Sequence, residues 1–211
     1  MKTSVAKATG WLIFWWVAVE IGFYWLTSRS GSASFNTRLV SGLLWGLIIG
    51  LVAMRYCRLK FFPMLLAAVG WAGAYYFSGQ MIQLLVKAVQ QLGTILSIDV
   101  DRPLNNLLGS YYFSNPLLGF LTGALGGLIT GLCLHWSGIL ADLKVAVVAV
   151  GWALAMALGF LLDYLLFTFF FSSSGSQLPT SLAVPLIIGL SGALISAIGG
   201  RVMFKAIEDS H

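Results

Sequence analysis

Two carboxylates inside apolar segments are the residues of this sequence best able to carry chemistry. Glu20 and Asp163 each interrupt a long run of apolar residues. A charged side chain at the centre of a bilayer costs at least ~2.5–3.5 kcal/mol, so an acidic residue there indicates a function by default. The two carboxyls could share a proton or a cation, pair with Arg38 or Lys87, contact a partner, or form structural hydrogen bonds. Protonation of either carboxyl in the apolar medium is a further alternative.

A stripe of polar side chains follows one face of the third apolar segment. Gln80, Gln83, Lys87 and Gln90 lie at positions i, i+3, i+7 and i+10, which share one side of a helix. The stripe could dip into the outer headgroup layer, or it could face a watery cavity or a partner subunit. The candidate binding residues are therefore Glu20, Asp163, Arg38, Gln83 and Lys87.

Motifs for catalysis, phosphate binding and metal binding are absent from the sequence. There is no Ser-His-Asp set with plausible spacing, no Gly-x-x-x-x-Gly-Lys loop and no HExxH motif. Cys133 and His135 are about 200° apart around a helix, so they do not converge on one metal ion. We therefore expect no enzymatic activity, no bound cofactor and no metal site.

The composition places these residues in a membrane. Of the 211 residues, 59% are hydrophobic and only 9% are charged, whereas soluble domains carry roughly 25% charged residues. The mean hydropathy is +0.91, and a soluble fold of this size could not hide so much apolar surface. This excludes an ordinary cytosolic enzyme, a disordered chain and, despite the net charge of +5, a nucleic-acid reader. We predict an all-α polytopic protein in contact with membrane lipids.

Six apolar segments approach or exceed the roughly 20 residues that a helix needs to cross the hydrocarbon core. With the amino terminus inside, eight Lys and Arg lie on the inner side and four on the outer side, which predicts that both termini are cytoplasmic. The first segment is long and rich in Trp, so we expect a retained helix rather than a signal peptide. The six predicted helices lie near 9–28, 36–56, 62–90, 115–137, 143–171 and 181–203.

The chain matches itself at an offset of 81 residues. Residues 41–51 align with 122–132, and 68–72 align with 149–153, without a gap. This predicts two helical hairpins that enter the membrane in the same direction, with the last helix as a half-copy. The expected organisation is a first helix and outer loop (1–34), a first hairpin with a long outer loop (35–115), a second hairpin (116–180), and a final helix with a cytoplasmic tail (181–211).

Small residues recur every fourth position on three of the segments. This period puts them on one helix face, where they allow another helix to approach closely. We expect these faces to pack within the chain or against a partner's helices; a flat surface for a ring-shaped lipid, quinone or pigment is the alternative. The glycines concerned are Gly42, Gly46, Gly50, Gly119, Gly123, Gly127, Gly131, Gly189 and Gly192.

Several tryptophans lie away from the expected membrane interfaces. Trp71 and Trp152 each follow a glycine in the repeat and are expected to fill the same gap in both hairpins. Trp15 and Trp16 lie deep in the first segment, where we expect them to face lipid or another subunit.

The repeated unit resembles the hairpin of a group of bacterial multi-pass membrane proteins. The motif GLLWGLIIGL … AAVGWA recurs as GALGGLITGL … VAVGWA, and the group carries tandem Gly-x-x-x-Gly helices, each followed by a Gly-Trp-Ala helix. The resemblance covers about half of the chain. It implies a fold and a place in a bacterial inner or internal membrane. It implies no activity, because none is established for the group.

Two functions fit these features. The first is a non-catalytic subunit or scaffold that packs into a larger membrane complex, or a homo-oligomer, through its small-residue faces. The second is a small-solute or ion transporter, or the substrate-binding membrane subunit of one. In the second, Glu20, Asp163 and the polar stripe would line the site.

Overall fold

The fold is known from a computed structural model that describes residues 5–30, 36–96, 111–172 and 179–210. Within these ranges the regular secondary structure is entirely α-helical, as the composition predicts. The helices are α1 (Val5–Ser30), α2 (Asn36–Cys57), α3 (Phe61–Leu96), α5 (Tyr111–Trp136), α6 (Asp142–Ser172) and α7 (Thr180–Glu208).

All six described helices are long and apolar enough to cross a membrane. Two of them extend well beyond the predicted ends. Helix α3 continues to Leu96 instead of ending near 90, and α7 continues to Glu208 instead of 203. The α7 extension contains good helix formers such as Lys205, Ala206 and Glu208, whereas the α3 extension includes Gly93 and Thr94, so helix propensity accounts for the first extension only.

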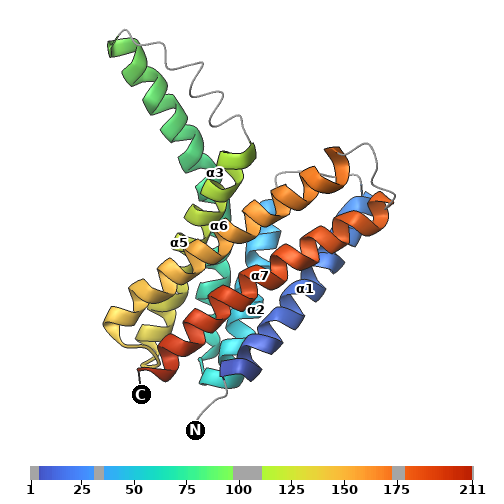
Figure 1. Cartoon of the computed structure of the whole chain (residues 1–211). Helices are drawn as coiled ribbons and strands as arrows, with labels where there is room; N and C mark the ends of the chain where they lie inside the picture. Colours follow the sequence, from blue (N-terminus) through green and yellow to red (C-terminus); the bar gives the residue numbers. More distant parts are fainter. Residues whose placement is uncertain (1–4, 31–35, 97–110, 173–178, 211) are drawn as a thin grey trace.

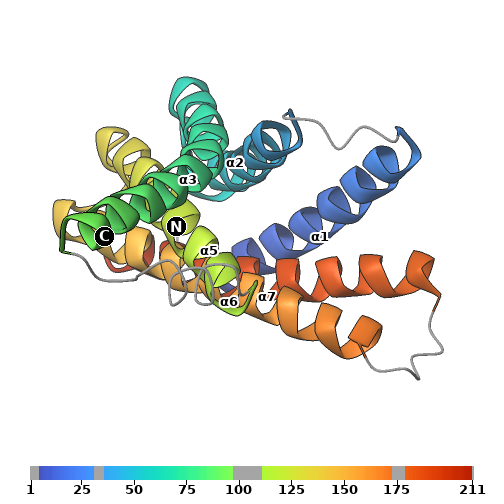
Figure 2. The same ribbon diagram turned by 90° about the horizontal axis from the view of Figure 1, so that it is seen from above.

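The six helices close into a ring. Each packs against two neighbours, in the order α1, α2, α3, α5, α6, α7 and back to α1. Both termini lie at the same end of the bundle, which we call the terminal end, and the opposite end is the distal end (Figure 1). Towards the distal end, α3 leans away from α6 and α7 (Figures 1 and 2).

Glycines allow the neighbouring helices of this ring to approach closely. A Cβ atom added to Gly46 of α2 would stand 2.5 Å from the Cα of Ala68 in α3, and one added to Gly127 of α5 would stand 3.0 Å from the Cα of Ala149 in α6. The backbones are thus in direct contact, as small-residue faces permit. The other glycines of the predicted faces that lie against a neighbouring helix are Gly42 and Gly50 (against α3), Gly119, Gly123 and Gly131 (against α6), and Gly189 and Gly192 (against α1).

Three fully buried tryptophans meet at the centre of the ring. We call Trp16 of α1, Trp71 of α3 and Trp152 of α6 the tryptophan cluster. Their ring centroids are 5.2 to 6.4 Å apart, with one stacked pair and two edge-to-face pairs, both favourable aromatic geometries. The prediction that Trp16 faces lipid or another subunit was wrong. Successive residues on a helix point about 100° apart, so Trp16 enters the core while Trp15 stays exposed.

One member of the cluster has a hydrogen-bond partner. The indole N–H of Trp71 donates to Oγ1 of Thr130 in α5 at 2.9 Å, and both groups are buried. The indole N–H groups of Trp16 and Trp152 have no partner among the described residues. Thr130 therefore supplies the hydrogen-bond acceptor for one of the three indole N–H groups of the cluster.

Replacing Thr130 by Val is expected to lower the free energy of unfolding by about 1–3 kcal/mol, because it leaves the buried Trp71 N–H without an acceptor. Thr122→Val is the matched control on the same helix. The Thr122 hydroxyl donates only to the Leu118 carbonyl of its own helix, so its loss leaves no donor unpaired. Thermal unfolding of both purified variants measures the difference, and equal stability would contradict the role assigned to Thr130.

Candidate functional site

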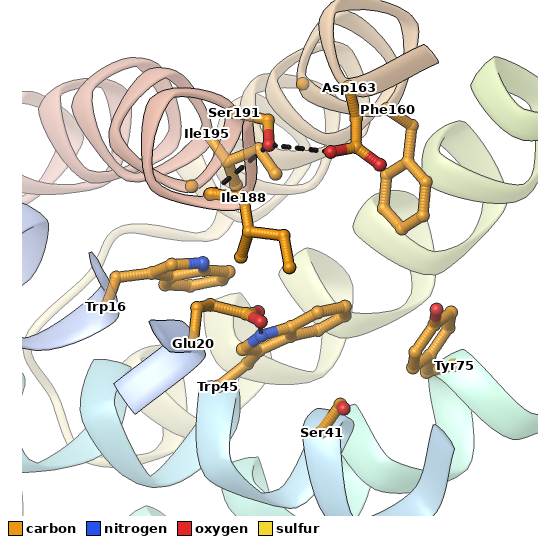
Figure 3. Close-up of a pocket in the computed structure, with 12 residues that line it drawn as sticks. Trp16, Glu20, Ser41, Trp45, Tyr75, Phe160, Asp163, Ile188, Ser191 and Ile195 are labelled. Atoms are coloured by element: carbon orange, nitrogen blue, oxygen red, sulfur yellow. Dashed lines mark hydrogen bonds between the residues drawn. The ribbon is translucent and has the colours of Figure 1, made fainter. Parts of the chain in front are cut away.

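The two intramembrane carboxylates line one pocket. Glu20 comes from α1 and Asp163 from α6, and both side chains are half-buried. The cavity has a volume of about 160 Å³, and five of the six helices contribute to it. We call it the carboxylate pocket (Figure 3). Its lining residues are Trp16, Glu20, Ser41, Trp45, Tyr75, Gly159, Phe160, Asp163, Ile188, Ser191, Gly192 and Ile195.

The pocket lies in the distal half of the bundle. Glu20 precedes the end of α1 by ten residues and Asp163 precedes the end of α6 by nine, which is about 13–15 Å at 1.5 Å per residue. Ser41 enters from the second turn of α2, which begins at the distal end. Glu20 and Asp163 therefore lie at similar distances from the distal end, within one site.

Each carboxylate receives a neutral hydrogen-bond donor from a neighbouring helix. The indole N–H of Trp45 donates to Oε1 of Glu20. The hydroxyl of Ser191 lies 3.2 Å from Oδ1 of Asp163 and 2.9 Å from the carbonyl oxygen of Ile187. A hydroxyl has one proton and donates to one acceptor at a time, so Asp163 competes for this donor with the backbone of α7.

Neither carboxylate forms an ion pair with a described lysine, arginine or histidine. The described ion pairs gather instead at the terminal end, around His135, Lys144 and Lys205. Arg38, expected as a possible partner, belongs to α2, but its side chain lies outside the described residues. A carboxylate has about four acceptor positions, so a single neutral donor leaves capacity for a bound cation or proton.

Aromatic rings form much of the remaining wall. The ring of Tyr75 is 4.8 Å from that of Trp45 and 6.2 Å from that of Phe160, measured between centroids. The rings border the space between the carboxylates (Figure 3). Trp16, whose buried N–H has no hydrogen-bond partner in the part of the chain that the structure describes, also lines the pocket. When ionised, carboxylates beside aromatic rings make an environment that favours a positive charge, which ring faces also attract.

Two sequence-predicted candidates lie elsewhere. Gln83 and Lys87 are exposed on α3, and neither lines the carboxylate pocket. The structure therefore brings together Glu20 and Asp163 but leaves the polar stripe on the outside of the bundle. This arrangement separates the stripe from the carboxylates with which it was expected to line a site.

The neutral members of the site were not predicted from the sequence. Ser41, Trp45, Tyr75 and Ser191 resemble ordinary residues of membrane helices when each is considered alone. One signal was present: Tyr75 follows Trp71 by four residues, as Glu20 follows Trp16. An alignment of the first and third helices on these tryptophans would have placed Tyr75 beside the pocket.

The described residues contain no group of three His, Cys, Asp or Glu side chains that could hold a metal ion. His135 lies instead 3.0 Å from Oδ1 of Asp142 and 3.1 Å from the Leu140 carbonyl oxygen, in the turn between α5 and α6. Cys133 is a free, buried thiol. The carboxyl groups and the hydroxyl and indole donors of the carboxylate pocket can bind a small polar or positively charged species.

Comparison with protein-family models, with curated proteins and with solved structures gives no match. The resemblance to bacterial proteins with tandem Gly-x-x-x-Gly hairpins therefore gains no support from these comparisons. The class of protein follows from the helices themselves. Six described helices of sufficient length and apolarity define a multi-pass integral membrane protein, and its helices contact lipid.

Proposed function

We propose that this protein binds a small positively charged solute in the carboxylate pocket and carries it across the membrane. It would act either alone or as the solute-binding membrane subunit of a transporter. The observation that carries the proposal is the convergence of Glu20 and Asp163, from helices far apart in the sequence, on one cavity. Ionisable residues inside membrane spans typically face such cavities and mark solute or ion pathways.

The volume of the pocket supports a small solute. Cavities for drug-sized ligands measure roughly 300–1,000 Å³, and this one measures about 160 Å³. The absence of an ion pair to either carboxylate among the described residues supports a positive charge on the solute. A small ammonium compound or a partly hydrated monovalent cation fits both properties.

The tryptophan cluster would separate the pocket from the terminal end. On α1, α3 and α6, which all run away from that end, Trp71 and Trp152 precede the pocket residues of the same helix, and Trp16 is the first pocket residue of α1. The Lys and Arg distribution favours termini in the cytoplasm, so the pocket would face the outside. Passage of a solute would then require these three indoles to separate.

The internal repeat is part of the same proposal. The contact of Gly46 with Ala68 between α2 and α3 recurs as that of Gly127 with Ala149 between α5 and α6. Gly127 follows Gly46 by 81 residues, and Ala149 follows Ala68 by the same number, which is the offset at which the sequence matches itself. This supports two equivalent hairpins that enter the membrane in the same direction.

The contacts of the tryptophan rings support a third unit. The ring of Trp71 lies on Gly126 of α5, and the ring of Trp152 lies on Gly199 of α7. Since Gly199 follows Gly126 by 73 residues, α7 would correspond to α5. In the ring of helices α7 packs against α1, so α1 would be the second helix of this third unit. The sequence match alone predicts only one helix, α7, for this unit.

The hydrogen bonding of the cluster agrees with three units. Thr130 accepts the bond from Trp71. The positions that would correspond to Thr130 in the other two units hold Ile49 and Met203. Neither side chain has a hydroxyl that could accept a hydrogen bond from an indole N–H. This accounts for the unpartnered N–H groups of the other two tryptophans.

The alternative, a subunit or scaffold of a larger membrane complex, has a weaker basis in the fold. Its main motivation was the set of small-residue faces, and the glycines of these faces lie against helices of the same chain. Native electrophoresis of gently solubilised membranes separates the two functions. Migration with a large complex favours the subunit, whereas migration alone or as a small homo-oligomer favours the transporter.

The test of the cation site is thermal unfolding of the purified protein in chloride salts of equal ionic strength. The bulky cation N-methylglucamine gives the baseline, and methylammonium, tetramethylammonium and sodium are the probes. A ligand that binds only the folded state stabilises it by about 2.7 kcal/mol at 100 times its Kd. We expect at least one probe to raise the unfolding temperature above the baseline. No difference among the four cations would refute a cation site.

A further inference from the structure

A second hollow lies on the outer surface of the bundle, between α1 and α2. We call it the α1–α2 groove; its volume is about 540 Å³. It is separate from the carboxylate pocket, so its occupant is independent of the solute proposed for that pocket. The groove is apolar except where α2 approaches the terminal end. Residues that define it are Trp11, Trp15, Leu44, Leu51, Arg55 and Tyr56.

The length of the groove matches one leaflet of a bilayer. From Leu44 to Arg55 the α2 wall covers twelve residues, and the eleven steps between them span about 16 Å at 1.5 Å per residue. Half of the ~30 Å hydrocarbon core is about 15 Å. A partner helix crossing the whole membrane would need a longer surface, because the α2 span covers 39–57. The groove therefore suits an acyl chain better than a transmembrane helix.

Positive charge gathers where the groove reaches the terminal end. Arg55 lies in the last turn of α2, with its guanidinium 5.8 Å from the centroid of the Tyr56 ring. Arg58 and Lys60 follow in the turn to α3, and all three cations are exposed. No described Asp or Glu forms an ion pair with them. An anion placed at Arg55 would meet a local excess of positive charge.

We propose that the α1–α2 groove is a binding site for one anionic phospholipid of the leaflet at the terminal end. One acyl chain lies along the groove between the exposed rings of Trp11 and Trp15 and the apolar side chains of α2. The headgroup phosphate accepts hydrogen bonds from Arg55, whose planar guanidinium suits bidentate binding of phosphate. Basic pockets between helices at a membrane surface hold anionic headgroups in this way.

Native mass spectrometry of the full chain, incubated with equimolar phosphatidylglycerol and phosphatidylcholine of identical acyl chains, tests the site. We expect the wild type to retain phosphatidylglycerol about five-fold more than phosphatidylcholine, the preference that one arginine near an anionic headgroup supplies. Arg55→Gln is expected to remove most of this preference. Leu51→Trp, at a position exposed on the groove wall, is expected to lower the retention of both lipids.

The matched control is Arg201→Gln, since Arg201 is an exposed arginine in the half of α7 nearer the terminal end. It should keep the wild-type preference. The proposal is overturned if the wild type shows no preference, if Arg55→Gln keeps it, or if Arg201→Gln loses as much as Arg55→Gln. It is equally overturned if Leu51→Trp retains both lipids like the wild type.

Discussion

Glu20→Gln and Asp163→Asn are each expected to abolish solute uptake and to remove the thermal stabilisation by the probe cation, while the protein still inserts and folds. In Glu20→Gln, the amide oxygen can still accept the hydrogen bond from Trp45. In Asp163→Asn, it can still accept one from Ser191. Each variant loses the negative charge of the carboxylate. The affinity for the bound cation is therefore expected to fall, while the contacts between the helices are kept.

The expected loss of affinity is at least about ten-fold for each variant. Two unit charges 4 Å apart interact by about 4 kcal/mol at an effective dielectric constant of 20, and a third of this energy already gives a factor of ten. The neutral amides also cost less to bury than carboxylates. We therefore expect both variants to unfold at or above the wild-type temperature when no probe cation is present.

Glu208→Gln is the control for a change from Glu to Gln outside the pocket, because Glu208 is exposed at the end of α7. Lys87→Gln is the control for the polar stripe, which lies away from the pocket. Both should bind the probe cation and support uptake like the wild type. Unchanged uptake in Glu20→Gln and Asp163→Asn would contradict the assignment of these carboxylates. Loss of uptake in Lys87→Gln alone would place the solute site at the polar stripe of α3 instead of the carboxylate pocket.

Gly46→Ala is expected to destabilise the bundle by about 1–3 kcal/mol or more, the range for overpacking a tight contact. The added methyl group would stand 2.5 Å from the Cα of Ala68 and 2.9 Å from the carbonyl oxygen of Ala67. Both are backbone atoms and cannot rotate away, so α2 and α3 must move apart. Thermal unfolding of the purified variant measures the cost.

Gly22→Ala is the matched control, since an added Cβ at Gly22 of α1 would meet no atom within 4 Å. It should leave stability unchanged or raise it slightly. Gly127→Ala tests the internal repeat, because its Cβ would stand 2.8 Å from the Cβ of Trp152 and 3.0 Å from the Cα of Ala149. A cost similar to that of Gly46→Ala supports equivalent hairpins. A Gly46→Ala protein as stable as Gly22→Ala would contradict close packing of α2 on α3.

The helices could be predicted because each is a local property of the chain. A run of about 20 apolar residues must satisfy its own backbone groups in a membrane, which only a helix does for a single segment. The helix ends do not follow from the apolar runs in the same way. Helix α3 continues to Leu96 through Gly93 and Thr94, which have low helix propensity, so neither the apolar pattern nor propensity marks its end.

The candidate site could be predicted only in its charged members. Glu20 and Asp163 were recognisable because a carboxylate is costly in an apolar span. Their neutral neighbours, such as Trp45 and Ser191, carry no such signal. Trp16 was misplaced for a related reason: a tryptophan is equally acceptable at a lipid surface and in a core.

Composition and apolar length act one segment at a time, so the membrane environment, the six helices and the two costly carboxylates follow from the amino-acid sequence. The shared pocket of the two carboxylates, the meeting of Trp16 with Trp71 and Trp152 and the packing of α1 against α7 are properties of the folded bundle. These features depend on which helices are neighbours and on how each is rotated about its axis. Glycine contacts and ring stacking between distant segments determine which helices are neighbours and how each is rotated. These contacts cannot be derived from one segment considered alone.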